Sequence, residues 1–195
     1  MQNDKDMREI IEIGLSRAAE FVMSGDLADR VFLVEDRGGK KSVVMAPSES
    51  YESDTRMLTY LRLLFAILGV QAYCMVSEVW VSERSTREGP APSEDPNRKE
   101  AIIALAVRRV RGESGEPMLV ARTARRTITR NPTTVSPIDW CDGVEVSGRF
   151  ATLLPVVDHA PCPDVPFALK KLQEMGKGLG FGFMDVEEEK RKGAH

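Results

Sequence analysis

Cysteine and histidine are scarce in this chain of 195 residues, which restricts the chemistry it can support. The three cysteines, Cys74, Cys141 and Cys162, are an odd number without compact spacing, so the sequence predicts no disulfide framework. Such usage is typical of a reducing compartment, and we expect a cytoplasmic protein. Only His159 and the last residue, His195, could serve in histidine-based catalysis.

Long hydrophobic runs and a basic leader are lacking as well. Residues 1–6 are polar and acidic, the opposite of the start of a signal peptide. The most apolar helical stretch, residues 57–70, is too short to span a membrane and contains Arg62. The sequence therefore predicts a soluble protein with no membrane partner.

What the chain does contain is ordinary for a globular protein, with 42% hydrophobic and 29% charged residues. We expect one α+β domain over residues 1–176, followed by a tail over residues 177–195 that contains glycine, phenylalanine and a charged end. Periodicity and turn residues divide the domain. The predicted helices are residues 5–24, residues from Ser53 or Asp54 (either a possible cap) to 68, and a last helix from about Asp164 to Gly176. The predicted strands are residues 31–35, 42–46, 72–83, 100–111 and 117–130, with two short ones possible within 138–146 and 149–157.

The two longest strands, residues 100–111 and 117–130, are joined by a turn rich in glycine and are predicted to form a long central antiparallel hairpin. The first of them is apolar on both faces, a pattern typical of strands covered on both sides. The element order favours an antiparallel sheet packed by two or three helices on one face.

One stretch resembles a known group of proteins. Ser77-Glu78-x-Trp80, followed by Pro92-Ser93-Glu94-x-Pro96-x-Arg98-x-Glu100, is similar to a signature in small uncharacterised proteins of bacteria and their phages. The resemblance covers at most residues 53–111. It implies an intracellular α+β domain of the kind carried by phages or mobile elements, and implies no activity.

A basic strip lies inside this acidic chain. Residues 108–130 contain seven arginines and two glutamates, whereas the net charge of the whole chain is −3. The candidate phosphate-binding residues are Arg108, Arg109, Arg111, Arg122, Arg126 and Arg130. Alternation places Arg122, Arg126 and Arg130 on one face of their strand and Arg125 on the other. Aromatic residues for base stacking are missing from both strands, so a solvated sheet face paired with acids is the competing interpretation.

Glu78 shares its strand face with apolar neighbours and with Trp80, so its carboxylate is predicted to lie on the more buried side. A buried carboxylate needs a partner, and we expect Arg122, Arg126 or Arg98 to provide it. The pair is interpreted as a structural ion pair. In the alternative interpretation, Glu78 is a functional acid beside Trp80.

Metal chemistry has weak candidates. Cys141, His159 and Cys162 form only half of a zinc signature, and a Cys141–His159 nucleophilic pair lacks any local sign of activation. The acids Glu94, Asp95 and Glu100 are interpreted as solvated loop charges rather than as ligands of a magnesium-dependent nuclease. No cofactor is expected.

The tail alternates glycine with Leu179, Phe181 and Phe183, which makes an adaptable apolar strip for a partner or a second subunit. From these observations the sequence favours a non-enzymatic protein-interaction or regulatory protein that acts through a protein partner or self-association. The first alternative is a nucleic-acid-binding accessory protein that uses the arginines, and the second is a metal-dependent hydrolase.

Overall fold

The computed structural model describes residues 2–25, 30–46, 51–82, 95–141, 152–156, 160–176 and 182–185. Within these residues the chain forms three helices and eight strands. In chain order they are α1 (Gln2–Ser24), β1 (Arg30–Glu35), β2 (Lys41–Ala46), α2 (Tyr51–Leu68), β3 (Ala72–Val81), β4 (Lys99–Arg111), β5 (Pro117–Thr129), β6 (Thr134–Val135), β7 (Asp139–Trp140), α3 (Val165–Gly176) and β8 (Gly182–Asp185). The predicted α+β class is confirmed.

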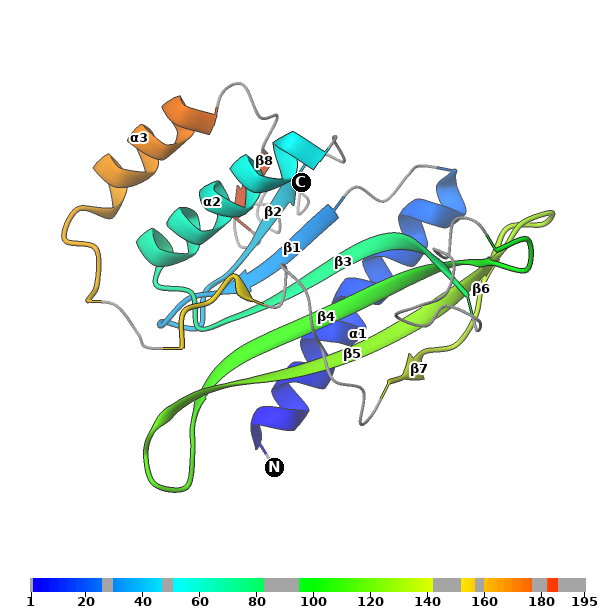
Figure 1. The fold of residues 1–195 in the computed structure, drawn as a ribbon, viewed down its shortest axis with the longest axis horizontal. Coiled ribbons are helices and arrows are strands. Elements are labelled where there is room, and N and C mark those ends of the chain that lie inside the picture. Colours follow the sequence, from blue (N-terminus) through cyan, green and yellow to red (C-terminus); the bar gives the residue numbers. More distant parts are fainter. Residues whose placement is uncertain are drawn as a thin grey trace, which may run out of the picture.

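The strands form one open antiparallel sheet, in the order β6-β5-β4-β3-β1-β2-β8, and β7 also pairs with β5 (Figure 1). The predicted hairpin is present as β4 and β5, which pair from Glu100↔Ile128 to Arg111↔Pro117. On its other side β4 pairs with β3 over the full length of that strand. Strand β4 is therefore interior, whereas the outer edge of β5 has only the short strands β6 and β7.

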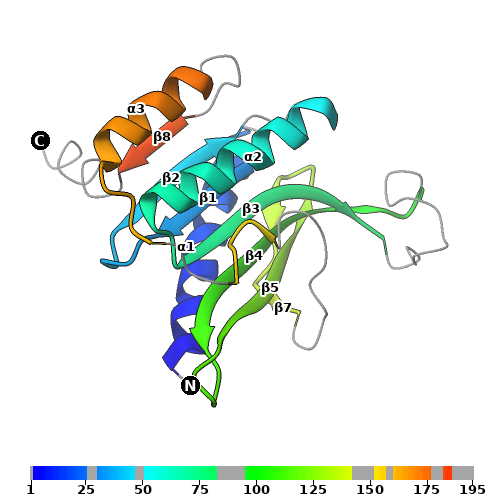
Figure 2. The same ribbon diagram turned by 60° about the vertical axis from the view of Figure 1, so that its left-hand side comes forward.

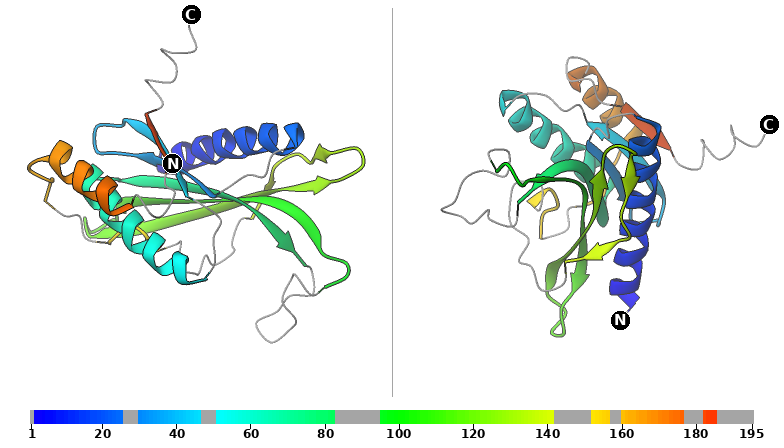
Figure 3. Two further views of the ribbon diagram at one scale, coloured as in Figure 1. Left: turned by 90° about the horizontal axis from the view of Figure 1, so that it is seen from above. Right: turned by 90° about the vertical axis from the view of Figure 1, so that its right-hand side faces the viewer.

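The two faces of the sheet carry separate hydrophobic cores, because successive side chains of a strand point to opposite faces. Tyr73 and Met75 pack beneath α2, whereas Cys74 and Val76 pack beneath α1. Helix α3 lies beside α2 and joins its core through Leu172 (Figure 2). Figure 3 shows α1 on one side of the sheet and the α2–α3 pair on the other.

Two helices thus share one face, as the sequence predicts, but α1 covers the opposite face. The reason lies in β4, whose residues Ala104 and Ala106 form an apolar second face that needs a cover. Small side chains let the helix come close. A Cβ atom at Gly14 of α1 would lie only 2.8 Å from Cγ2 of Val76. Helix α1 therefore lies closest to Val76 at Gly14, which has no side chain.

Local turn chemistry agrees with the sequence. Gly25 and Gly69 follow α1 and α2 with φ angles of 90° and 65°, a conformation that favours glycine. The turn between β1 and β2 is closed by Asp36, whose Oδ1 accepts hydrogen bonds from the backbone N–H groups of Gly38 and Lys40. Asp164 caps α3, because its Oδ1 accepts a hydrogen bond from the N–H of Phe167 at 3.0 Å.

Two local predictions are wrong. Helix α2 begins at Tyr51, so Ser53 and Asp54 lie inside the helix rather than at its cap. Of the possible strand within 149–157, the described residues 152–156 form no strand. Leu153 and Leu154 are instead buried in the core under α2, so burial rather than strand pairing explains their apolar character.

The C-terminal strand β8 pairs with β2 in register from Ser42↔Asp185 to Met45↔Gly182. Residues 182–185, which the sequence assigns to a tail, therefore belong to the sheet through their backbone. Of the predicted contact residues, Leu179 and Phe181 lie outside the described residues, and only the backbone of Phe183 is described. None of the helices described is long and apolar enough to cross a membrane.

Candidate interaction site

The arginines of the basic strip contact protein groups. Arg108 Nη2 lies 3.0 Å from Glu35 Oε1, and Arg122 Nε lies 2.9 Å from Asp4 Oδ1. Arg109 donates to the carbonyl oxygen of Pro155, whereas Arg126 donates to the carbonyl oxygen of Ser136 at 2.6 Å. As predicted, Arg122 and Arg126 share one face of β5 and Arg125 lies on the other. The shared face is the α1 face, and Arg125 on the α2 face pairs with Asp139 at 2.8 Å. These contacts support the competing interpretation, a sheet face paired with acids and carbonyl groups.

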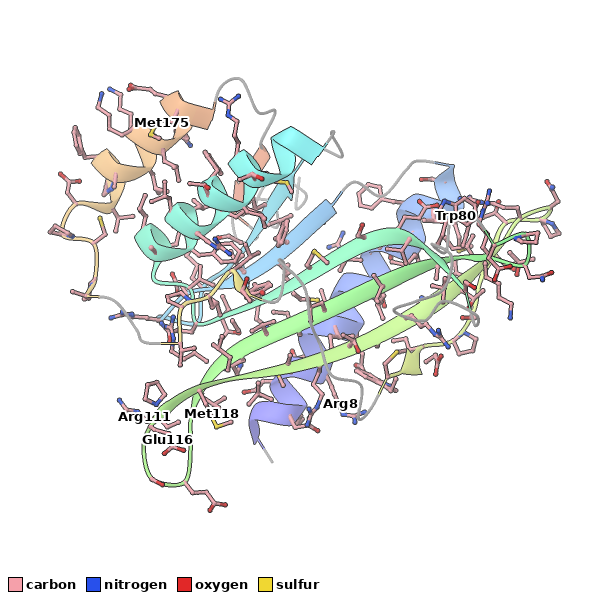
Figure 4. The ribbon with its side chains drawn as sticks, in the orientation of Figure 1. Arg8, Trp80, Arg111, Glu116, Met118 and Met175 are labelled. Carbon is pink, nitrogen blue, oxygen red and sulfur yellow. The ribbon has the colours of Figure 1, made fainter. Side chains whose placement is uncertain are left out.

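Arg122 has a structural function at the start of α1. Its hydrogen bond, followed by that of Arg8, lowers the pKa of Asp4, although burial acts in the opposite direction. Arg8 also lies 4.5 Å from the ring centroid of Trp140 in β7. Together these contacts join α1 to the outer strands. The side chain of Arg111, at the β4–β5 hairpin end (Figure 4), makes no ion pair or hydrogen bond with a described residue.

Glu78 lies on the α1 face of β3 with a partner that the sequence analysis missed. Its Oε1 accepts a hydrogen bond from Arg130 Nη2 at 3.1 Å, and Arg130 Nε lies 2.6 Å from Glu100 Oε2. Arg130 thus joins two carboxylates across three strands. The predicted partners are used elsewhere. Arg98, for example, lies over the ring of Trp80 at 4.6 Å from its centroid.

The pairing with Arg130 follows from the sheet register. Ile102 of β4 separates Glu78 from Arg126, which stands in the same row. Arg130 is the residue directly after β5, and its side chain extends back to Glu78. The side chain of Glu78 is 18% exposed and that of Arg130 is 38% exposed, and Glu78 Oε2 is buried without a hydrogen-bond partner among the described residues. This arrangement favours the structural ion pair.

Replacement of Arg130 by Met is expected to lower the free energy of unfolding by about 2 kcal/mol, between the values typical of exposed and buried ion pairs. The variant leaves two neighbouring carboxylates without their shared cation. Adding Glu78→Gln should restore part of the loss, because one unpaired charge disappears. Urea denaturation measures both effects.

Arg125→Met is the matched control for Arg130→Met. It breaks the ion pair of Arg125 with Asp139, whose side chains are 40% and 57% exposed, respectively. The free energy of unfolding should therefore fall by less than about 1 kcal/mol. Equal losses from Arg125→Met and Arg130→Met would contradict the special importance of the Glu78 cluster.

Of the three weak metal-ligand candidates, the structure describes only the two cysteines. Cys141 and Cys162 are both half-buried and free, and His159 and Glu94 lie outside the described residues. Among the residues that the structure describes, no three His, Cys, Asp or Glu side chains stand close enough to hold a metal ion.

Asp95 is not the solvated loop charge that the sequence predicts, since it is only 4% exposed. Its carboxylate accepts hydrogen bonds from the Ser82 hydroxyl group and, at 2.8 Å, from the N–H of Asn97. The Asp-Pro-Asn sequence is a turn signal that could have indicated this local bonding. Asp95, Asn97, Lys99 and Arg125, together with Val81, Ala101 and Thr127, line a cavity of about 350 Å³ on the α2 face of the sheet end.

An apolar groove lies between α2 and α3, and we call it the α2–α3 groove. It has a volume of about 230 Å³ and is lined by Arg56, Thr59, Tyr60 and Leu63 from α2 and by Leu172 and Met175 from α3. Leu172 and Tyr60 are buried in its floor, at 3% and 9% exposed. Leu63 and Met175 remain 43% and 67% exposed on its walls. Met175 projects from the last turn of α3 in Figure 4.

No pattern in the sequence predicted this groove, although one signal points to it. The apolar stripe of α2 that meets the sheet, which includes Leu61 and Phe65, is buried. Leu63 lies off that stripe, because it stands two residues from each of them on a helix of 3.6 residues per turn. An apolar side chain outside the core stripe either packs against a second helix or stays on an exposed surface. Leu63 does both, because it lies beside α3 and lines the exposed groove.

One charged residue, Arg56, lines the groove. Helices α2 and α3 together contain four basic residues, Arg56, Arg62, Lys170 and Lys171, and three acidic residues, Glu52, Asp54 and Glu174. Lys171 and Glu174 pair at 3.0 Å. The side chain of Arg56 makes no ion pair or hydrogen bond within the described part of the chain.

Comparison of the chain with protein-family models, with curated proteins and with solved structures found no match.

Proposed function

We propose that the chain is a non-enzymatic protein-interaction protein and that the α2–α3 groove is its docking surface. The observation that supports this proposal is the exposure of Leu63 and Met175 on the walls of an apolar groove in the folded chain. Large apolar side chains gathered around a concave surface are typical of protein-binding sites.

The size of the groove favours a protein side chain over a small-molecule ligand. Its volume of about 230 Å³ is below the range of about 300–1,000 Å³ that is typical of small-molecule sites. It suits one or two anchoring side chains of a partner. Complete burial of Leu63 or Met175 would contribute about 1.5–3 kcal/mol each, so a few such contacts carry useful affinity.

The proposal keeps the setting indicated by the sequence, a cytoplasmic protein of bacteria or their phages. Three free cysteines, one of them buried, support a reducing compartment. The contact predicted for Leu179, Phe181 and Phe183 stays a prediction. Nucleic-acid binding receives less support, because most arginines of the basic strip already contact protein groups.

Site-specific crosslinking tests the docking surface. With the photoreactive residue p-benzoylphenylalanine in place of Met175, irradiation in the cells from which the chain derives should give a discrete adduct with another protein. The same residue in place of Met23 of α1 is the control, since Met23 is similarly exposed, at 62%. Identical adducts from both positions, or none from position 175, would overturn the proposal.

A further inference from the structure

We propose that the outer edge of strand β5 is a second interaction surface, at which an extended segment of another protein is added to the sheet. Along its inner edge, β5 pairs with β4 from residue 117 to residue 128. Along its outer edge, β6 and β7 pair only within residues 124–129, and Cys141 bonds to Thr123. No described strand pairs with residues 117–122 on this side, next to the hairpin end in Figure 1.

The unpaired backbone groups of this edge belong to alternate residues. The N–H group of Thr127 donates to Ser136 Oγ at 2.8 Å, and its C=O group accepts from the N–H of Ser136 at 2.9 Å, so both groups point outwards. Because the direction of these groups alternates along a strand, those of Leu119 and Ala121 point outwards too. Within the described chain, only the carbonyl oxygen of Ala121 has a partner there, Arg122 Nη1 at 3.2 Å, and it keeps a second lone pair.

The edge has few of the features by which sheets avoid pairing. Natural sheets protect a free edge with charged side chains, with proline or with a very short strand. Residues 118–121 carry no charge, and Met118 is 41% exposed. Pro117 lies only at the start of β5, and the charge of Arg122 is neutralised by Asp4 at 2.9 Å. An unpaired apolar edge of this kind is a template for another strand.

The hydrogen-bonding groups determine the kind of partner. Alternate N–H and C=O groups along about 20 Å of edge match the backbone of an extended segment of about six residues. A helix satisfies its own backbone groups internally and offers no such ladder. Because residues 118–121 are uncharged, the segment that pairs beside them should be uncharged and rich in β-branched residues.

A second copy of the chain fits this edge poorly. If a second β5 paired antiparallel with residues 117–122, its preceding turn, residues 112–116, would continue along the outer edge past residue 123. Strand β7 already occupies the edge there, since Trp140 pairs with Ala124. The open stretch therefore suits a short segment that leaves the sheet before β7.

Selection from random heptapeptides displayed on phage, with the full chain immobilised, provides the test. It should enrich uncharged peptides rich in valine, isoleucine and threonine. Ala121→Pro removes an outward N–H group and should weaken a synthetic copy of an enriched peptide about tenfold or more. Ala121→Ser keeps the N–H group and should leave the affinity unchanged. Thermal melts check the fold, which tolerates proline where the N–H faces away from the sheet.

Met118→Lys is a second variant, on an exposed side chain. It should also weaken the peptide, because a lysine on a strand edge opposes pairing. Met175→Glu, in the α2–α3 groove, should leave the same peptide unaffected, so failure of the edge and failure of the proposed docking surface are distinguishable. No enrichment, or enriched peptides that bind Ala121→Pro as tightly as the wild type, would overturn the inference.

Two measurements on the free chain test the other occupants. The N–H groups of Leu119 and Ala121 should exchange with deuterium faster than those of Val120 and Arg122, which face β4. Equal protection in a monomer would show that another segment of the same chain covers the edge. A dimer in sedimentation that Ala121→Pro dissociates would identify a second copy as the occupant. Either result would overturn the inference.

Discussion

Replacement of Phe65 by Ala is expected to lower the free energy of unfolding by about 3–5 kcal/mol. Phe65 is 1% exposed and lies between α2 and the sheet. Its ring packs edge-on against Phe32, at a centroid distance of 6.3 Å, and is tilted against the ring of Tyr73, at 5.3 Å. The substitution leaves a cavity where the helix that carries the groove meets the sheet, so urea denaturation should show the loss directly.

The control is Phe167→Ala on α3. Phe167 is 59% exposed, and its removal should change the free energy of unfolding by less than about 0.5 kcal/mol. Phe65→Leu should lie between the two, because leucine refills part of the cavity. A loss below about 1 kcal/mol for Phe65→Ala would contradict the packing of α2 on this face.

The second large effect is expected in alkali, where the folded state should lose stability between about pH 9 and pH 12. Burial raises the pKa of the Cys74 thiol from 9.0 to about 12. Burial also raises the pKa of the Tyr73 hydroxyl group, while a hydrogen bond with the backbone of Leu153 opposes the shift. Both groups stay protonated in the folded protein at pH values where they ionise in the unfolded chain.

The direction of the change in stability with pH follows from the raised pKa values of the two groups. Below pH 9 both states hold the Cys74 proton, and the stability is fully present. As the pH rises above 9 the unfolded state loses this proton first, so unfolding becomes easier. A shift of this size corresponds to about 4 kcal/mol by pH 12 from Cys74 alone. Urea midpoints measured from pH 8 to pH 11 should fall steadily.

Cys74→Ala and Tyr73→Phe each remove one of the two titrating groups, so each variant should show a shallower loss of stability with pH than the wild type. In the folded protein, Cys141 and Cys162, which are half-buried, should react with a thiol reagent well before the fully buried Cys74 does. Rapid labelling of Cys74 at pH 8, or an unchanged pH slope in Cys74→Ala, would refute the buried thiol.

Patterns within short stretches of the chain were enough to predict most of the elements. Gly25 and Gly69 end helices, Asp36 closes a turn and Asp164 caps α3, because each acts on backbone groups a few residues away. Alternation likewise predicted which residues of β4 share a face. The cap of α2 was predicted wrongly, since side chains that favour a cap do not prevent a helix from starting earlier.

The candidate site depended on distant contacts. Alternation placed Glu78 and the arginines on the correct faces, but the partner of each charge was decided by strand register and by α1, whose Asp4 takes Arg122. Asp95 became buried because a turn folds back on Ser82. Neither arrangement has a signal at a fixed spacing in the sequence, because the partners lie on different strands and loops.

The sequence by itself determined the α+β class, the long antiparallel hairpin and the two apolar faces of β4, since these depend on periodicity and on turn residues. Only the tertiary structure decided that α1 covers one face while α2 and α3 share the other. That choice leaves Leu63 and Met175 exposed around a common groove. The physical reason is that a helix buries the stripe that meets the sheet, and side chains outside that stripe acquire a role only from their neighbours in space.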